Sequence, residues 1–157
     1  MRTIQIVLLV ICCIAVVTGS ALAETYELKG ASTWNPVSVD TVELADGRTM
    51  TRQVLNGTAI AENPDTPLSR MSQDCMFTTV TAADGKSFST GGYCDGVDTD
   101  GDVYWAVGTA TEKGGTWHYI GGTGKFEGLE GGGTYQIAHE WPDGKVMATW
   151  DGTATMK

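Results

Sequence analysis

The chain has 157 residues, of which 41% are hydrophobic and only 18% are charged, and its formal charge is −9. This length favours a single domain, and the 21 glycines with so few charged residues argue against a helical bundle. A nucleic-acid surface needs clustered Lys and Arg, whereas here 19 acidic residues outnumber 10 basic ones. We therefore expect an all-β protein with no nucleic-acid partner.

The first 23 residues have the pattern of an export signal. Arg2 gives a positive start, residues 4–17 form an apolar run, and Ala21-Leu22-Ala23 is a typical cleavage site. The run is shorter than the roughly 20 residues that a membrane-spanning helix needs, so a membrane anchor is the weaker alternative. We predict a cleaved signal peptide at 1–23, a single domain at 24–157 without a membrane span, and a periplasmic or extracellular location.

Alternation of apolar and polar residues predicts strands along the rest of the chain. At the start of the predicted domain, Tyr26, Leu28 and Trp34 fall on one face of an extended segment, with polar residues between them. We expect about nine strands and no helix after the signal. The expected strands are residues 25–34, 38–44, 49–61, 71–81, 87–94, 103–111, 115–120, 132–140 and 146–155.

Four Asp-Gly pairs separate these segments and predict tight hairpins. The turns are residues 45–48, 83–86, 99–102 and 142–145. Hairpins in which sequential strands pair make a meander, and a meander of this length must protect its edges. We therefore predict a single antiparallel up-and-down β-barrel of about eight strands, with a β-sandwich as the alternative.

Two cysteines, Cys75 and Cys94, remain after the predicted signal. In an exported chain such a pair is expected to form a disulfide. If the turn between them pairs Ala83 with Lys86, the same register places the cysteines opposite each other at a hydrogen-bonded pair, with Cα atoms about 5.5 Å apart. A bulge at Gly91-Gly92 would shift this register by one residue.

A glycine-rich stretch follows, Gly121-Gly122-Thr123-Gly124-Lys125-Phe126 and onward to Tyr135. It resembles the GGTGxF…GxGxY segment of the dirigent and allene-oxide-cyclase-like barrels. The blocks 63–68 and 94–102 resemble segments of small exported bacterial proteins. The resemblance extends over most of residues 63–152 and implies a small antiparallel barrel that holds an apolar ligand.

Four aspartates lie close together in the chain and are candidate metal ligands. Carboxylate oxygens suit Ca²⁺, but a calcium loop would need Gly where Val103 stands and Glu where Thr109 stands. We favour a solvated hairpin turn over a metal site, and we expect no cofactor. The four residues are Asp95, Asp98, Asp100 and Asp102.

Aromatic side chains are the candidate lining of an interior site, because small-molecule pockets are mainly apolar with a few polar groups. For any one of them taken alone, we favour a role in filling the core. His118 alternates with Trp117 and Tyr119 along one strand, so one of these two sets faces inward. The candidate ligand-binding residues are Trp34, Tyr104, Trp105, Trp117, Tyr119, Tyr135 and Trp150.

Catalytic candidates are few. The two histidines, His118 and His139, are potential acids or bases together with Glu140 or Tyr135, and no nucleophile motif accompanies them. We predict that the barrel interior binds a small apolar or aromatic molecule. A cyclase or isomerase acting in the same cavity is the alternative, and a non-catalytic barrel acting through its surface or through homo-oligomer contacts is the third.

Overall fold

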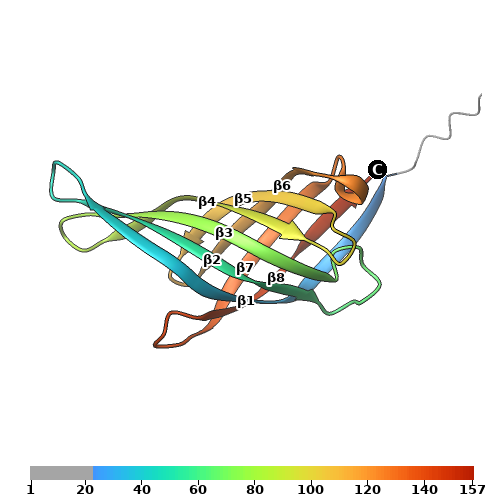
Figure 1. The fold of residues 1–157 in the computed structure, drawn as a ribbon, viewed down its shortest axis with the longest axis horizontal. Coiled ribbons are helices and arrows are strands. Elements are labelled where there is room, and N and C mark those ends of the chain that lie inside the picture. Colours follow the sequence, from blue (N-terminus) through green and yellow to red (C-terminus); the bar gives the residue numbers. More distant parts are fainter. Residues whose placement is uncertain (1–22) are drawn as a thin grey trace, which may run out of the picture.

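Residues 23–157 are described by the computed structural model, and the predicted signal peptide lies outside them apart from Ala23. Eight strands in chain order form one closed antiparallel barrel (Figure 1). Among the described residues, no helix is long and apolar enough to cross a membrane. The elements are β1 (Glu24–Glu43), β2 (Thr49–Ala61), β3 (Arg70–Thr81), β4 (Ser87–Val97), β5 (Val103–Thr111), β6 (Gly114–Gly122), the short 3₁₀ turn η1 (Gly124–Phe126), β7 (Glu130–Glu140) and β8 (Val146–Met156).

The predicted up-and-down barrel is confirmed, with eight strands rather than nine. The expected strands 25–34 and 38–44 are one strand, β1, whose register against β2 shifts between Pro36 and Ser38. Proline lacks the N–H that a sheet ladder needs and is tolerated at a bulge. The chain therefore bends here without ending the strand. The expectation of no helix is also wrong in one place, at the three residues of η1.

All four Asp-Gly turns are three-residue loops and not the two-residue turns that the sequence suggested. In the β3–β4 turn, the Ala82 N–H donates to the Lys86 carbonyl, and the Gly85 N–H donates to the Ala82 carbonyl. Gly85 has φ +83°, while no residue other than glycine has a positive φ in the described chain. Because the aspartate stays at negative φ, a type I turn followed by a left-handed glycine forms in place of type I′.

The Cys75–Cys94 disulfide is present, and the two cysteines are direct partners on β3 and β4. The three-residue loop moves the pairing near the turn by one residue, and a register shift between Thr78 and Thr79 moves it back. The Cα atoms are 4.1 Å apart. This distance fits a non-hydrogen-bonded pair and corrects the expected 5.5 Å.

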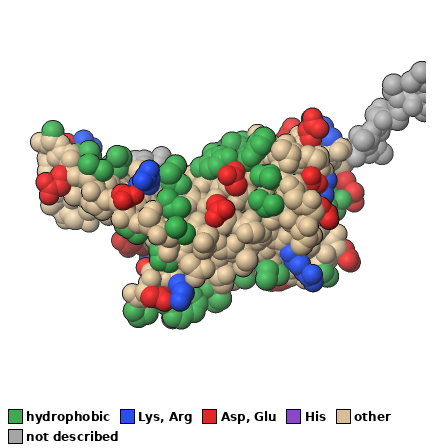
Figure 2. All heavy atoms as spheres, in the orientation of Figure 1, with side chains coloured by type: hydrophobic (Ala, Val, Ile, Leu, Met, Phe, Trp, Pro, Cys, Tyr) green, Lys and Arg blue, Asp and Glu red, His purple; other side chains and the backbone are tan. Residues whose placement is uncertain are grey.

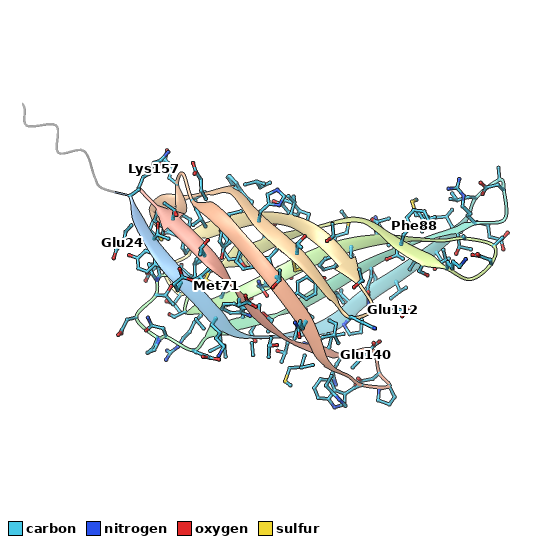
Figure 3. All side chains as sticks on the ribbon, turned by 180° about the vertical axis from the view of Figure 1, so that it is seen from behind. Glu24, Met71, Phe88, Glu112, Glu140 and Lys157 are labelled. Atoms are coloured by element: carbon cyan, nitrogen blue, oxygen red, sulfur yellow. A yellow bond between two sulfur atoms is a disulfide. The ribbon has the colours of Figure 1, made fainter. Side chains whose placement is uncertain are left out.

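One end of the barrel is closed by apolar side chains from the loops. Phe126 of η1 is fully buried, and Leu129 and Leu68 are almost so. They pack with Leu28 and Met71 on the strands in one core cluster. Figure 3 shows Met71 on the part of the sheet nearest this end. The floor thus comes from the glycine-rich segment after β6 and the loop after β2.

At the opposite end of the barrel, the hairpins point in two directions. The β1–β2 and β3–β4 hairpins project well beyond the barrel, and the β7–β8 hairpin leaves in a different direction (Figure 1). Phe88, which is 51% exposed, lies on the projecting β3–β4 hairpin (Figure 3). Apolar side chains also reach the outer surface along this projection and over the barrel wall (Figure 2). Three hairpins thus extend from this end, whereas the buried side chains of Phe126, Leu129 and Leu68 cover the opposite end (Figure 1).

Candidate functional site

An apolar cavity of about 80 Å³ lies inside the barrel. Its walls come from inward-facing residues of all the strands, and one wall includes the disulfide through Cys94. Its aromatic lining consists of Trp34, Phe77, Tyr104, Trp117, Tyr119, Tyr135 and Trp150. For comparison, an engineered cavity of about 150 Å³ in another protein holds benzene. The space as it stands suits part of a planar ring.

Glycines on neighbouring strands make room for these rings. A Cβ atom placed on Gly92 would collide with the ring of Phe77, and one on Gly96 would collide with the ring of Tyr104. Large side chains can therefore lie flat against the barrel wall without filling its centre. This explains, in terms of space, why a barrel with so many aromatic residues keeps a void.

A chain of hydrogen bonds crosses the apolar lining. The Trp34 Nε1–H donates to Gln73 Oε1 at 3.2 Å, and Gln73 Nε2 donates to the Tyr104 hydroxyl at 2.6 Å. Two residues from Trp34 on β1, Ser32 Oγ accepts a hydrogen bond from the Trp150 Nε1–H at 2.9 Å. Buried polar groups need such partners, since an unmet one costs roughly 1–3 kcal/mol. These bonds fix the orientation of both indole rings.

Tyr119 differs from the other polar groups of the cavity. Its ring packs edge-to-face on Tyr104 and Trp117, yet none of the described residues forms a hydrogen bond with its hydroxyl. Burial raises the pKa of Tyr119 well above its usual value, and burial also raises the pKa of Tyr104 and of Tyr135 to about 12. All three hydroxyls are therefore neutral at physiological pH.

The structure brings together most of the residues suggested as ligand contacts. Trp34, Tyr104, Trp117, Tyr119, Tyr135 and Trp150 all line the cavity. Trp105 does not, because it alternates with Tyr104 and Ala106, which face inward, and its ring lies over Gly121. Ser32, Met71, Gln73 and Phe77 also line the cavity and were missed. The alternation that puts Gln73 on the face of Cys75 was the available signal.

The suggested acid and base residues are not assembled into a site. His118, His139 and Glu140 are exposed and do not line the cavity, and Figure 3 shows Glu140 at the base of the β7–β8 hairpin. A two-residue turn at 142–145 would pair His139 with Ala148, but the three-residue loop of this hairpin pairs His139 with Met147. Of the four catalytic candidates, only Tyr135 lines the cavity, and its hydroxyl donates to the Thr109 carbonyl at 3.2 Å.

The aspartate cluster holds a lysine ammonium. Lys125 Nζ forms ion pairs with Asp98 and with Asp100, the latter at 2.7 Å, and the Lys125 N–H donates to Asp102 Oδ2. The fourth aspartate, Asp95, instead accepts a hydrogen bond from the Tyr93 hydroxyl. Within residues 23–157, no group of three or more His, Cys, Asp or Glu is placed to hold a metal ion. The cluster ties the β4–β5 turn to η1 beneath the barrel floor.

This tie should make stability depend on acid pH. Burial of the Asp98 carboxyl raises its pKa, but the Lys125 ammonium and two backbone N–H groups outweigh burial and hold the pKa below its usual value. A pKa lowered by folding adds stability that is present above the unfolded pKa of about 3.9 and is lost below it. We expect the urea midpoint to fall between about pH 4.5 and pH 2.5, and to fall less in Asp98→Asn.

The control for this titration is Asp65→Asn, which removes an exposed carboxylate from the β2–β3 loop. It should keep the acid loss of the wild type. If Asp98→Asn and the wild type lose the same stability over this pH range, the ion pair does not contribute to folding.

Comparison with solved structures identifies the fold. The pterocarpan synthase dirigent protein GePTS1 has a TM-score of 0.56 to this structure, with 11% sequence identity over 90% of this chain and 94% of that one. The dirigent protein PsPTS1 has a TM-score of 0.49 with 12% identity, over 85% of this chain and 96% of that one. No family model and no curated protein matches the chain. The chain therefore has a dirigent-like barrel fold.

Proposed function

We propose that this protein is exported and that its barrel binds a small, uncharged aromatic molecule in the cavity. The disulfide supports an oxidising location. The lining supports an uncharged ligand, because the described residues around the cavity include no Asp, Glu, Lys, Arg or His. A charged ligand would lose its hydration there without gaining a partner.

The Tyr119 hydroxyl carries this proposal. It lines the cavity without a hydrogen bond to the described protein, and it is accessible to water, since Asp98 Oδ2 is the only buried side-chain N or O atom without a partner among the described residues. Water can be its partner in the empty cavity, and a ligand that displaces this water must supply a hydrogen bond in its place. A ligand hydroxyl or carbonyl beside the ring would supply it, while the aromatic lining covers the ligand's faces.

Catalysis has less support than binding. The fold is that of a protein called a pterocarpan synthase, so turnover in the same cavity is the second candidate. General acid-base work at neutral pH favours groups whose pKa lies near 7. Among the described residues that line the cavity, the titratable groups are tyrosine hydroxyls, whose pKa is raised to about 12 at Tyr104 and Tyr135. These groups can donate hydrogen bonds and orient a ligand.

Removing only the Tyr119 hydroxyl tests the proposal. We expect Tyr119→Phe to weaken binding of 4-methylphenol about 3- to 10-fold and to leave binding of toluene unchanged, because one neutral hydrogen bond is worth roughly 0.5–1.5 kcal/mol. Titration calorimetry or tryptophan fluorescence would measure both affinities.

The matched control is Tyr93→Phe. The Tyr93 hydroxyl donates to Asp95 Oδ1 at 2.6 Å on the outer face, so its loss should affect neither probe. Failure of both probes to bind the wild type would support a barrel filled by its own side chains. Equal weakening of both probes by Tyr119→Phe would mean that the hydroxyl does not contact the ligand.

A further inference from the structure

A second hollow lies outside the barrel, where β1 and the β7–β8 hairpin separate. The ladder between β1 and β8 ends at the pair Trp34–Val146. Beyond it, β1 continues beside β2 while the chain before β8 turns away, leaving a fork (Figure 1). A groove of about 320 Å³ lies in this fork, with walls that include Trp34, Asn35, Trp141, Asp143, Lys145 and Val146. We call it the fork groove.

Trp34 is the wall shared by the fork groove and the interior cavity. Its side chain is held by the Nε1–H bond to Gln73 and by an edge-to-face contact with Tyr135 at 6.0 Å between ring centres. Trp34 is the one described residue that lines both spaces. Small-molecule sites begin at about 300 Å³, so the cavity of about 80 Å³ is too small for a whole ligand, whereas the fork groove beside it has about 320 Å³.

The side chains of the fork groove suit a ligand ring that has an apolar face and carries hydroxyl groups around its edge. Trp141 is 40% exposed and offers an aromatic surface beside Asn35. Asp143 and Lys145 pair with each other at 2.8 Å, so they offer donors and acceptors without net charge. A sugar presents C–H groups on one face and hydroxyls around its rim, which match an indole with polar neighbours.

We propose that the binding site continues from the cavity into the fork groove, with Trp34 as the gate between them. The ligand is then an uncharged molecule with a planar ring for the cavity and a hydroxyl-rich end, such as a sugar, for the fork groove. This inference rests on the proposed function, because the ring must enter the cavity for its attached group to reach Trp141.

Two probes and two variants test whether the binding site extends into the fork groove. The probes are phenol, which needs the cavity alone, and phenyl β-glucoside, which has the same ring joined to a sugar. We expect Trp141→Ala to weaken binding of the glucoside about 3- to 10-fold and of phenol less than 2-fold. Trp105→Ala, at an outward tryptophan that lines neither space, is the matched control and should change neither affinity.

The outcomes separate this inference from the proposed function. Two results would overturn the extension into the fork groove while leaving the proposed cavity site unaffected. In one, phenol binds and the glucoside does not; in the other, Trp141→Ala weakens binding of both probes equally. Binding of neither probe overturns both. A separate experiment tests the gate. Trp34→Ala should increase the association rate of both probes, measured by stopped-flow fluorescence. An unchanged or slower association rate would contradict the gate.

Discussion

Replacing Phe126 by alanine is expected to lower the free energy of unfolding by about 3–5 kcal/mol, the usual cost of truncating a fully buried phenylalanine. Phe126 is 0% exposed and packs edge-to-face on Tyr104 at 6.2 Å between ring centres. It also occupies the space that a side chain on Gly122 would need. Because η1 lies across the barrel end, truncation leaves a hole that the rigid strands cannot close. Urea denaturation followed by tryptophan fluorescence would measure the loss.

The matched control is Phe88→Ala. Phe88 is 51% exposed on the projecting hairpin, so its truncation should cost less than about 1 kcal/mol. Similar losses in the two variants would show that Phe126 does not close the barrel floor.

Removing the disulfide is expected to cost about 3 kcal/mol. The bond joins residues 19 apart in the sequence, and a crosslink of this span restricts the unfolded chain by roughly that amount in the chain-entropy account. The double variant Cys75→Ala/Cys94→Ala should unfold at a lower urea concentration. Cys75 is buried, so lost packing adds to the effect.

Reductant provides the control for the disulfide. It should lower the urea midpoint of the wild type and leave that of the double variant unchanged. Protein from exporting cells should begin at Glu24 and weigh about 2 Da less than its reduced form, since a disulfide lacks two hydrogens. An unchanged wild-type midpoint under reductant would contradict a stabilising role for the bond.

The sequence predicts the barrel well because its strands alternate cleanly and its turns carry Asp-Gly pairs. The sequence also predicts the Cys75–Cys94 pairing correctly, but only because two errors in the expected strand register cancel. The loop at Gly85 is one residue longer than expected, and the shift between Thr78 and Thr79 compensates. Between β7 and β8 the two effects add: the three-residue loop pairs His139 with Met147, and the shift between Ile137 and His139 moves the register one residue further from the expected one. Bulges depend on packing between strands, which local sequence does not encode.

The cavity lining was predictable in kind but not in detail. Alternation groups Trp117 with Tyr119 and separates both from His118, but it does not say which set faces inward. That choice follows from barrel closure, which turns Trp117 and Tyr119 toward Tyr104. Gln73 was missed because a lone polar residue on a strand gives no sign of its partners. Its role appears only with Trp34 and Tyr104 in place.

Closure of the barrel between β1 and β8 has a consequence for the order of folding. The hairpins join neighbours in the chain and can form early, but the β1–β8 ladder brings together residues such as Thr25 and Thr155, 130 positions apart. Contacts this distant are slow to form and must wait until the last strand is synthesised. Until then β1 and β7 present unpaired strand edges, which invite pairing with other chains. An unfolded chain carries this risk of wrong pairing until its final eleven-residue strand is in place.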